Sequence, residues 1–412
     1  MTSQLSPPMA PWALPFFDAV HRDVAARLVE WIKRQQVDET DDRQACRQWV
    51  QLLSEGQWLR YCVPSGADGE LGGALETLDS RALVVIRETL AFYSPLADFA
   101  FAMQGLGSGA ITLAGSAAQQ AAYLPEVARG KKIAAFALSE ADAGSDAGAM
   151  QTRAVQAAAS WTINGSKTWI SNGGIADFYV TFVKTDVDAG VRGITAFIID
   201  ADTPGLDSSE HIAVMAPHPL ATLKFSDCKL AAGCQLGPLN GGFKLAMQTL
   251  DIFRASVAGA ATGMARRALA EAINFSKQRQ MFGQTLADFQ MTQAKLGEMA
   301  ALVDAGALLA YRAAWLRDES LPSLPSLRIG DGESANTDTA GRSERTVAAA
   351  MAKMTATENA QRVIDMALQL HGGLGVKVGS KVESLYRDIR SLRIYEGATE
   401  VQQLIIGKAV LR

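Results

Sequence analysis

The segments FALSEADAGSDAGAM at 136–150 and WTINGSKTWISNGG at 161–174 mark a change of pattern in the chain. Before them, apolar residues such as Phe17, Val24 and Leu28 recur every three or four positions, which predicts an amphipathic helix. The same spacing predicts helices at 42–54, 80–95 and 116–128. A helical N-terminal domain over 1–135 is therefore expected.

The middle of the chain, over 136–240, has the pattern of an antiparallel β domain. Short β-branched and aromatic runs at 178–184 and 194–200 predict strands, and 221–227 alternates between apolar and polar residues. The pair Asn164-Gly165 predicts a tight hairpin turn, because both positions tolerate a positive φ.

Helical spacing returns from 241 to 412, with helices expected at 255–279, 290–318 and 344–372. Gly259 and Gly263 lie four residues apart, which favours close packing of one helix backbone on another. The segment 321–343 is rich in Ser, Pro, Gly and Asp and predicts an exposed, flexible loop inserted between two helices. The third region, 241–412, is therefore expected to be helical.

Composition excludes several classes of protein. The 412 residues are 48% hydrophobic and 20% charged, with a net charge of −4, so a nucleic-acid or anionic membrane partner is not expected. The four cysteines form no CxxC and are expected to be reduced, and the four histidines form no metal-binding motif. We find neither a targeting segment at the N-terminus nor an apolar run that predicts a membrane span, so a cytoplasmic protein is expected.

Three common catalytic motifs are missing: GxGxxG between a strand and a helix, GxxxxGK[ST], and GxSxG. The closest approach to the first, Gly105, Gly107 and Gly109, lies in a helical context. Any chemistry should therefore depend on a carboxylate, on a bound organic cofactor, or on both.

Two segments around the helix-to-sheet transition could bind a ligand. The small residues and hydroxyls around Ser139, Gly144 and Ser145 could form a polar cradle, or simply an interdomain turn. Trp169 could lie against a planar cofactor, or in the core.

The C-terminal region offers further candidates. Asp251 and Arg254 share a helix face, either at a site or as a surface ion pair. Arg279 could bind phosphate or lie in a surface turn, and QLHGGLG at 369–375 could expose glycine backbone. Glu396, between a loop and a helix, could be a general base or an ordinary surface glutamate.

In this order and spacing, the segments closely resemble the acyl-CoA dehydrogenase family of flavoproteins, over nearly the whole chain. The strongest matches are SEADAGSD with NGSKTWISNGG, and HGGLG with IYEGATEVQ. The resemblance implies a mainly helical α+β fold: an N-terminal helical domain, a middle β domain and a C-terminal four-helix bundle. FAD would bind between the β domain and the bundle and reach a neighbouring subunit.

The resemblance also implies roles for individual residues. Glu396 matches the catalytic base. The residues that match FAD contacts are Phe136, Leu138, Ser139, Gly144, Ser145, Trp169, Ile170, Ser171, Arg279, Met281, Phe282, Phe289, Gln290, Gln369, Gly372, Gly373, Ala398, Thr399 and Glu400. Those that match substrate contacts are Ser145, Asp251, Arg254, Tyr395 and Gly397.

The implied reaction is α,β-dehydrogenation of an acyl-CoA thioester to the trans-2-enoyl thioester. Glu396 would remove the α-proton, the β-hydride would pass to flavin N5, and a separate acceptor such as an electron-transfer flavoprotein would take the electrons. Some relatives carry the base just before the arginine of LDxxR, where this chain has Phe253, so Glu396 has no rival. Ala141 replaces a proline that is common in the family.

Other outcomes of the same fold remain open. They are an oxidase, a flavin monooxygenase, and a dehydrogenase of carrier-protein-bound acyl groups. A scaffold without activity would be expected to lack the base, which is present here. A homo-oligomer, with a dimer of dimers as the family's usual form, is expected because the family completes half of its flavin site with a second chain.

Overall fold

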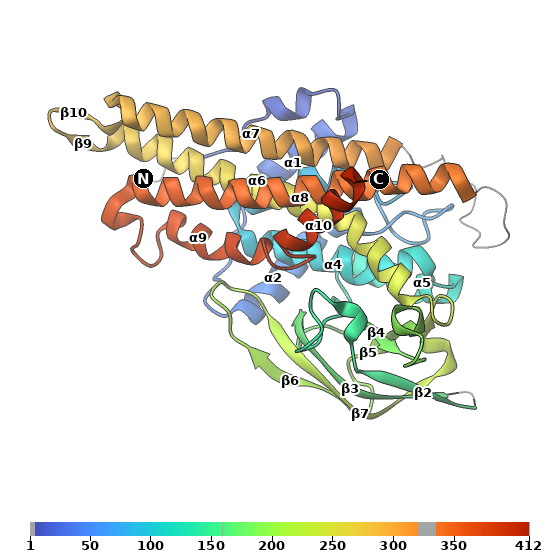
Figure 1. Cartoon of the computed structure of the whole chain (residues 1–412). Helices are drawn as coiled ribbons and strands as arrows, with labels where there is room; N and C mark the ends of the chain where they lie inside the picture. Colours follow the sequence, from blue (N-terminus) through green and yellow to red (C-terminus); the bar gives the residue numbers. More distant parts are fainter. Residues whose placement is uncertain (1–4, 159, 320–334, 412) are drawn as a thin grey trace. The chain divides into compact units, whose positions relative to one another are not determined.

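The computed structural model describes residues 5–158, 160–319 and 335–411 (Figure 1), without the side chains of 335–343. The chain forms two compact units. The first comprises Met1–Arg34, Ser80–Asp98 and Asp251–Arg412, and the second comprises Gln35–Asp79 and Phe99–Leu250. The unit boundaries fall within α4 (Pro95–Ala114) and α6 (Gly242–Gln278).

The first unit is built from long helices. They are α1 (Ala19–Ile32), α3 (Ser80–Tyr93), most of α6, α7 (Gln290–Glu319), α8 (Ala335–His371), α9 (Lys381–Leu392) and α10 (Thr399–Val410). Helix α7 packs along α8, and α9 and α10 both pack on α8 (Figure 1). Helix α7 also packs against α3. The alanine-rich faces of these helices are almost fully buried, so they supply much of the core of this unit.

The two glycines of α6 allow the close packing that their spacing predicts. A Cβ at Gly259 would lie 2.9 Å from the carbonyl oxygen of Val84, and one at Gly263 would overlap the carbonyl of Glu88. Helix α6 therefore approaches α3 backbone to backbone, which only glycine permits here.

The second unit contains an eight-stranded sheet with α2 (Asp42–Glu55), α5 (Ala117–Ala128) and the rest of α4. The strands are β1 (Ala134–Ala137), β2 (Arg153–Ala157), β3 (Ser160–Ser171), β4 (Phe178–Lys184), β5 (Ile194–Asp200), β6 (Leu206–Ile212), β7 (Leu220–Ala231) and β8 (Gln235–Leu236). Their order is β6-β7-β3-β2-β4-β5-β8, with β1 also paired to β4. Most pairings are antiparallel, but β1 and β2 run parallel to β4.

The hairpin turn predicted at Asn164-Gly165 is wrong. Both residues lie inside β3, where the register against β7 shifts between Ile163 and Gly165. Gly165 has φ +135°, and a Cβ there would lie 2.7 Å from the Cα of Thr152. The glycine thus serves a β-bulge with a close backbone approach, a use that the turn motif cannot distinguish from a hairpin.

Only part of the loop predicted over 321–343 lies among the residues that the structure describes. Residues 320–334 lie outside the described residues, but 335–343 form the first segment of α8. The prediction of a loop over 335–343 is therefore wrong. The segment has too few apolar residues for their spacing to indicate a helix, so the sequence pattern could not predict one.

One described helix, α7, is long and apolar enough to cross a membrane by composition alone. Core helices of globular proteins meet the same criterion, and α7 packs on α3 and α8. All four cysteines are free thiols, and three of them are buried.

Candidate active site

Glu396 lies in the short turn between α9 and α10, in the first unit. Its backbone has φ +53° and that of Gly397 has φ +92°, so two consecutive residues are left-handed. A positive φ is uncommon for glutamate and costs energy unless surrounding contacts hold it. The observed strain is consistent with a functional position.

Three side chains from other parts of the first unit hold this turn. Arg254 Nε donates to the carbonyl of Glu396 at 3.3 Å. The carbonyl of Gly397 accepts hydrogen bonds from Gln402 Nε2 at 2.9 Å and from Lys353 Nζ at 2.8 Å. All three donors are buried, so the turn is fixed from inside the helical bundle.

One oxygen of the Glu396 carboxyl group has no hydrogen-bond partner among the described residues. Its Oε2 is buried and accepts no hydrogen bond. Burial raises the pKa of Glu396, the nearby cations Arg87, Lys353 and Arg254 act in the opposite direction, and Asp98 adds to the rise. A carboxylate held this way is a stronger base than one in water, which general-base catalysis requires.

A buried ion pair lies beside Tyr395 and Glu396. Arg87 on α3 binds Asp98 on α4 through two parallel bonds of 2.8 and 2.9 Å, and also donates to Ser256 Oγ at 3.0 Å. Burial raises the pKa of Tyr395, so its hydroxyl stays neutral.

Asp251 and Arg254, both on α6, form the ion pair that their spacing suggests, at 2.5 Å, with Arg254 buried and Asp251 half-buried. Arg254 is buried, and Thr346 on α8 donates to the second oxygen of Asp251 at 2.9 Å. The charge of Arg254 is therefore matched within the bundle.

The expected flavin residues of the β domain lie on two adjacent segments of the second unit. Phe136 is in β1, while Leu138, Ser139, Gly144 and Ser145 follow it in a turn. Trp169, Ile170 and Ser171 end β3, and the Thr168 N–H donates to the carbonyl of Ser139 at 3.0 Å, which joins the segments.

Trp169 is not a core aromatic. Its side chain is 56% exposed, and the residue has φ +61°. Ile170 beside it is buried and anchors the strand end. An indole ring presented in this way is suited to lie against a planar ligand.

A buried ion pair that the sequence did not single out supports the turn after β1. Lys167 Nζ contacts Glu140 Oε1 at 2.8 Å and donates to the carbonyl of Leu138 at 2.9 Å. Burial lowers the pKa of Lys167 to about 8. Burial alone would raise the pKa of Glu140, but Lys167 and the Gln151 N–H lower it overall.

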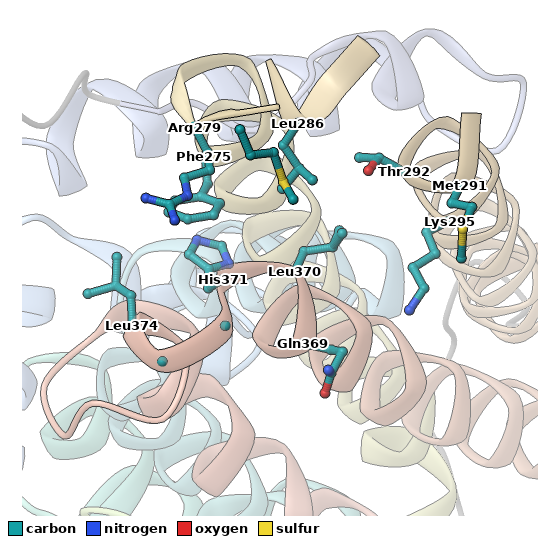
Figure 2. Close-up of a pocket in the computed structure, with 13 residues that line it drawn as sticks. Phe275, Arg279, Leu286, Met291, Thr292, Lys295, Gln369, Leu370, His371 and Leu374 are labelled. Atoms are coloured by element: carbon teal, nitrogen blue, oxygen red, sulfur yellow. The ribbon is translucent and has the colours of Figure 1, made fainter. Parts of the chain in front are cut away.

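Residues expected to contact the dinucleotide line a cavity of about 600 Å³ in the first unit (Figure 2). Arg279 directly follows α6, and Met281 lies in the short strand β9 (Gln280–Met281). Gln369 is in the last turn of α8, and Gly372 and Gly373 are in the 3-10 turn that follows it. The ring of His371 stacks on Phe275 beside them, with centroids 4.4 Å apart.

The remaining candidates lie outside this cavity lining. Phe282, with φ +50° and 88% exposed, forms with Gly283 the turn to strand β10 (Gln284–Thr285). Phe289 lies edge-on to Phe282 just before α7, which begins at Gln290.

Three more candidates lie at the start of α10. Ala398 is the N-cap residue of that helix. Thr399 donates to Glu358 Oε1 at 2.5 Å, and Glu400 is exposed.

The residues present fit FAD. Arg279 and Lys295 bring two cations to the cavity, as the pyrophosphate of a dinucleotide requires. A Cβ at Gly372 or Gly373 would meet no atom within 4 Å, so their backbone is open to a ligand. Lys295, which the sequence analysis missed, has no motif of its own and is identified only by this cavity.

Three matches to the acyl-CoA dehydrogenase family cover the chain in order. The N-terminal domain of the family matches residues 17–131, the middle domain 135–228 and the C-terminal domain 240–411.

Curated relatives match over most of their length. A 3-(aryl)acrylate reductase from Clostridium sporogenes is 35% identical over 394 residues, or 95% of this chain and 96% of its own. The caffeyl-CoA reductase-Etf complex subunit CarC from Acetobacterium woodii is 36% identical over 81% and 83%. A short-chain specific acyl-CoA dehydrogenase from Megasphaera elsdenii is 37% identical over 88% and 89%.

Solved structures agree with this result. Butyryl-CoA dehydrogenase from Megasphaera elsdenii superposes with a TM-score of 0.84 at 31% identity, covering 96% of this chain and 99% of its own. An acyl-CoA dehydrogenase from Bacillus anthracis, solved with FAD, gives 0.84 at 29% identity, covering 100% and 70%. The chain is therefore an FAD-dependent oxidoreductase that belongs to the acyl-CoA dehydrogenase family.

Proposed function

We propose that the chain oxidises an acyl-CoA thioester to the trans-2-enoyl thioester, with Glu396 as the base that removes the α-proton. The observation that carries the proposal is the half-buried Glu396, whose Oε2 is buried without a hydrogen-bond partner, on a turn held by Arg254, Lys353 and Gln402. When bound, FAD supplies the acceptor for the two electrons that leave as hydride from the β-carbon.

The chain's own contribution is to hold the base ready. Desolvation makes the carboxylate of Glu396 more basic, and the surrounding cations keep it ionised. The rate of substrate oxidation should therefore rise with pH as Glu396 loses its proton, with a midpoint above the ordinary carboxyl range.

The opposite direction is a second candidate, favoured by the two relatives named as reductases. A protonated Glu396 would then return the proton to the α-carbon of an enoyl thioester, since the same group must serve both directions. The electron partner would set the direction. We propose an electron-transfer flavoprotein, as the name of the CarC relative indicates for that protein.

A panel of saturated and unsaturated short-chain and aryl acyl-CoA thioesters tests this proposal. Each saturated thioester is added without oxygen to the oxidised FAD-loaded protein, and loss of flavin absorbance is followed. Each unsaturated thioester is added without oxygen to protein whose flavin has first been reduced, and return of flavin absorbance is followed. Glu396→Gln should retain FAD and lower the bleaching rate by about 10³-fold, the scale expected for removing a general base. Glu76→Gln, an exposed glutamate, is the control. Wild-type bleaching rates in Glu396→Gln would refute the assignment of the base.

Repeating the substrate additions in air, and with carrier-protein thioesters, separates the alternatives. Oxygen consumption with substrate would indicate an oxidase or monooxygenase, and turnover only of a carrier-protein thioester would indicate that class. We further propose a homo-oligomer, a dimer of dimers, because large apolar side chains such as Phe282, Met291 and Leu404 are exposed. Light scattering after gel filtration measures the oligomer.

We also propose a cytoplasmic location, which the free thiols favour. Cell fractionation measures the location. Recovery of the protein in a membrane or secreted fraction would contradict it.

A further inference from the structure

We propose that Lys353 is a positioning residue for Glu396: its buried ammonium fixes the turn through the Gly397 carbonyl and stabilises the carboxylate form of the base. The inference rests on the proposed role of Glu396 and extends it to a residue on a different helix, α8. Nothing in the sequence around Lys353, VAAAMAKMTA, connects it with the turn 43 positions later in the chain.

The contact is direct and shielded from water. Lys353 is fully buried, and its Nζ donates to the carbonyl of Gly397 at 2.8 Å. The Gly397 carbonyl follows the two left-handed residues, so holding it restrains the conformation of both. Gln402 Nε2 donates to the same oxygen at 2.9 Å, so two donors share one acceptor.

Lys353 differs from the other two cations near Glu396, Arg87 and Arg254, because each of those is paired with a carboxylate. Arg87 is paired with Asp98, and Arg254 with Asp251. Lys353 donates to a neutral carbonyl, and no carboxylate among the described residues lies within ion-pairing distance of its ammonium. Its positive charge is thus available to the nearby carboxyl of Glu396.

Charged groups from four other elements act most strongly on Glu396 and Lys353. Around Glu396 these are Arg87 from α3, Asp98 from α4, Arg254 from α6 and Lys353 from α8. Glu358 and Glu400 also act on Lys353. Burial lowers the pKa of Lys353 to about 8, while the negative charge of Glu396 opposes that change. The ammonium is therefore present at neutral pH, where it favours the ionised base.

The test compares four variants in the anaerobic bleaching assay from about pH 6 to about pH 10. Lys353→Met removes the charge and the hydrogen bond. Lys353→Gln removes the charge but keeps an N–H donor, which helps the turn to form if the methionine variant does not fold. Lys353→Arg keeps a cation. Lys229→Met removes an exposed lysine on β7 as the control.

The proposal predicts a shift of the acidic limb of the pH profile. Lys353→Met and Lys353→Gln should move it upward by about one pH unit, so that the rate below the limb falls about tenfold. Bound FAD should be unchanged. Lys353→Arg should lie close to wild type, and Lys229→Met should match it.

Two results would overturn the proposal: an unchanged acidic limb with a uniform loss of rate, or wild-type rates in both neutral variants. Failure of the proposed function itself would look different. In that case Glu396→Gln would retain bleaching, whatever the Lys353 variants do.

Discussion

The buried ion pair between Arg87 and Asp98 predicts that substituting either residue alone destabilises the protein. Both side chains are nearly inaccessible, with exposed fractions of 2% and 3%. Removing one partner leaves the other charge buried without compensation, which costs about 3–5 kcal/mol of folding free energy. Arg87→Met and Asp98→Asn should each destabilise the protein by this amount, whereas the double variant should cost much less than the sum.

The same two substitutions should move the pKa of Glu396 in opposite directions. Arg87 lowers that pKa and Asp98 raises it. Arg87→Met should therefore shift the acidic limb of substrate oxidation to higher pH. Asp98→Asn should shift it to lower pH, because the cation then acts on Glu396 without its counter-charge.

Two measurements check this reasoning. Urea unfolding of the FAD-loaded protein gives the change in stability, and anaerobic flavin bleaching across pH gives the acidic limb. Shifts of the limb in the same direction for both variants would refute the electrostatic argument. So would a loss below about 1 kcal/mol for each single variant, because an uncompensated buried charge cannot be that inexpensive.

Two further substitutions test the backbone turn and the support of the β domain. Gly397→Ala should cost about 1–3 kcal/mol in backbone strain, because Gly397 has φ +92°. The added Cβ would also displace Gln402 Nε2, so flavin bleaching should slow. FAD binding, measured by dialysis, should persist. Wild-type bleaching in this variant would contradict the role of the turn. Lys167→Met leaves the Glu140 carboxylate without its cation and should cost about 3–5 kcal/mol and weaken FAD retention, measured by flavin fluorescence in the filtrate. Unchanged retention would show that the pair does not support the cofactor.

The spacing of apolar residues was sufficient to predict most elements of secondary structure. The strands predicted at 178–184 and 194–200 have the bounds of β4 and β5, because short runs rich in β-branched and aromatic residues between Gly and Asp favour a buried strand. The close packing at Gly259 and Gly263 is confirmed as well. These features are local, or depend on one face of one element.

The predictions that failed, and the residues that were missed, depend on contacts distant in sequence. Asn164-Gly165 has the composition of a turn, but a bulge against β7 and a close approach to Thr152 use the same residues. Lys353 and Arg87 appear in the sequence as single charges within apolar helices. Only the fold shows that one reaches the Gly397 carbonyl and the other lies near Tyr395.

Different parts of the fold determine the position of the base Glu396 and its pKa. The turn between α9 and α10 positions Glu396. The charges that shift the pKa of Glu396 most strongly come from other helices, namely α3, α4, α6 and α8. Arg87 and Arg254 are each paired with a carboxylate, so substituting either arginine alone also leaves that carboxylate without its partner and lowers stability. Lys353 forms no ion pair among the described residues, so a substitution there that keeps a donor to the Gly397 carbonyl leaves no carboxylate without its partner. Sequence variation that adjusts basicity in this site should therefore be easier at Lys353 than at Arg87 or Arg254.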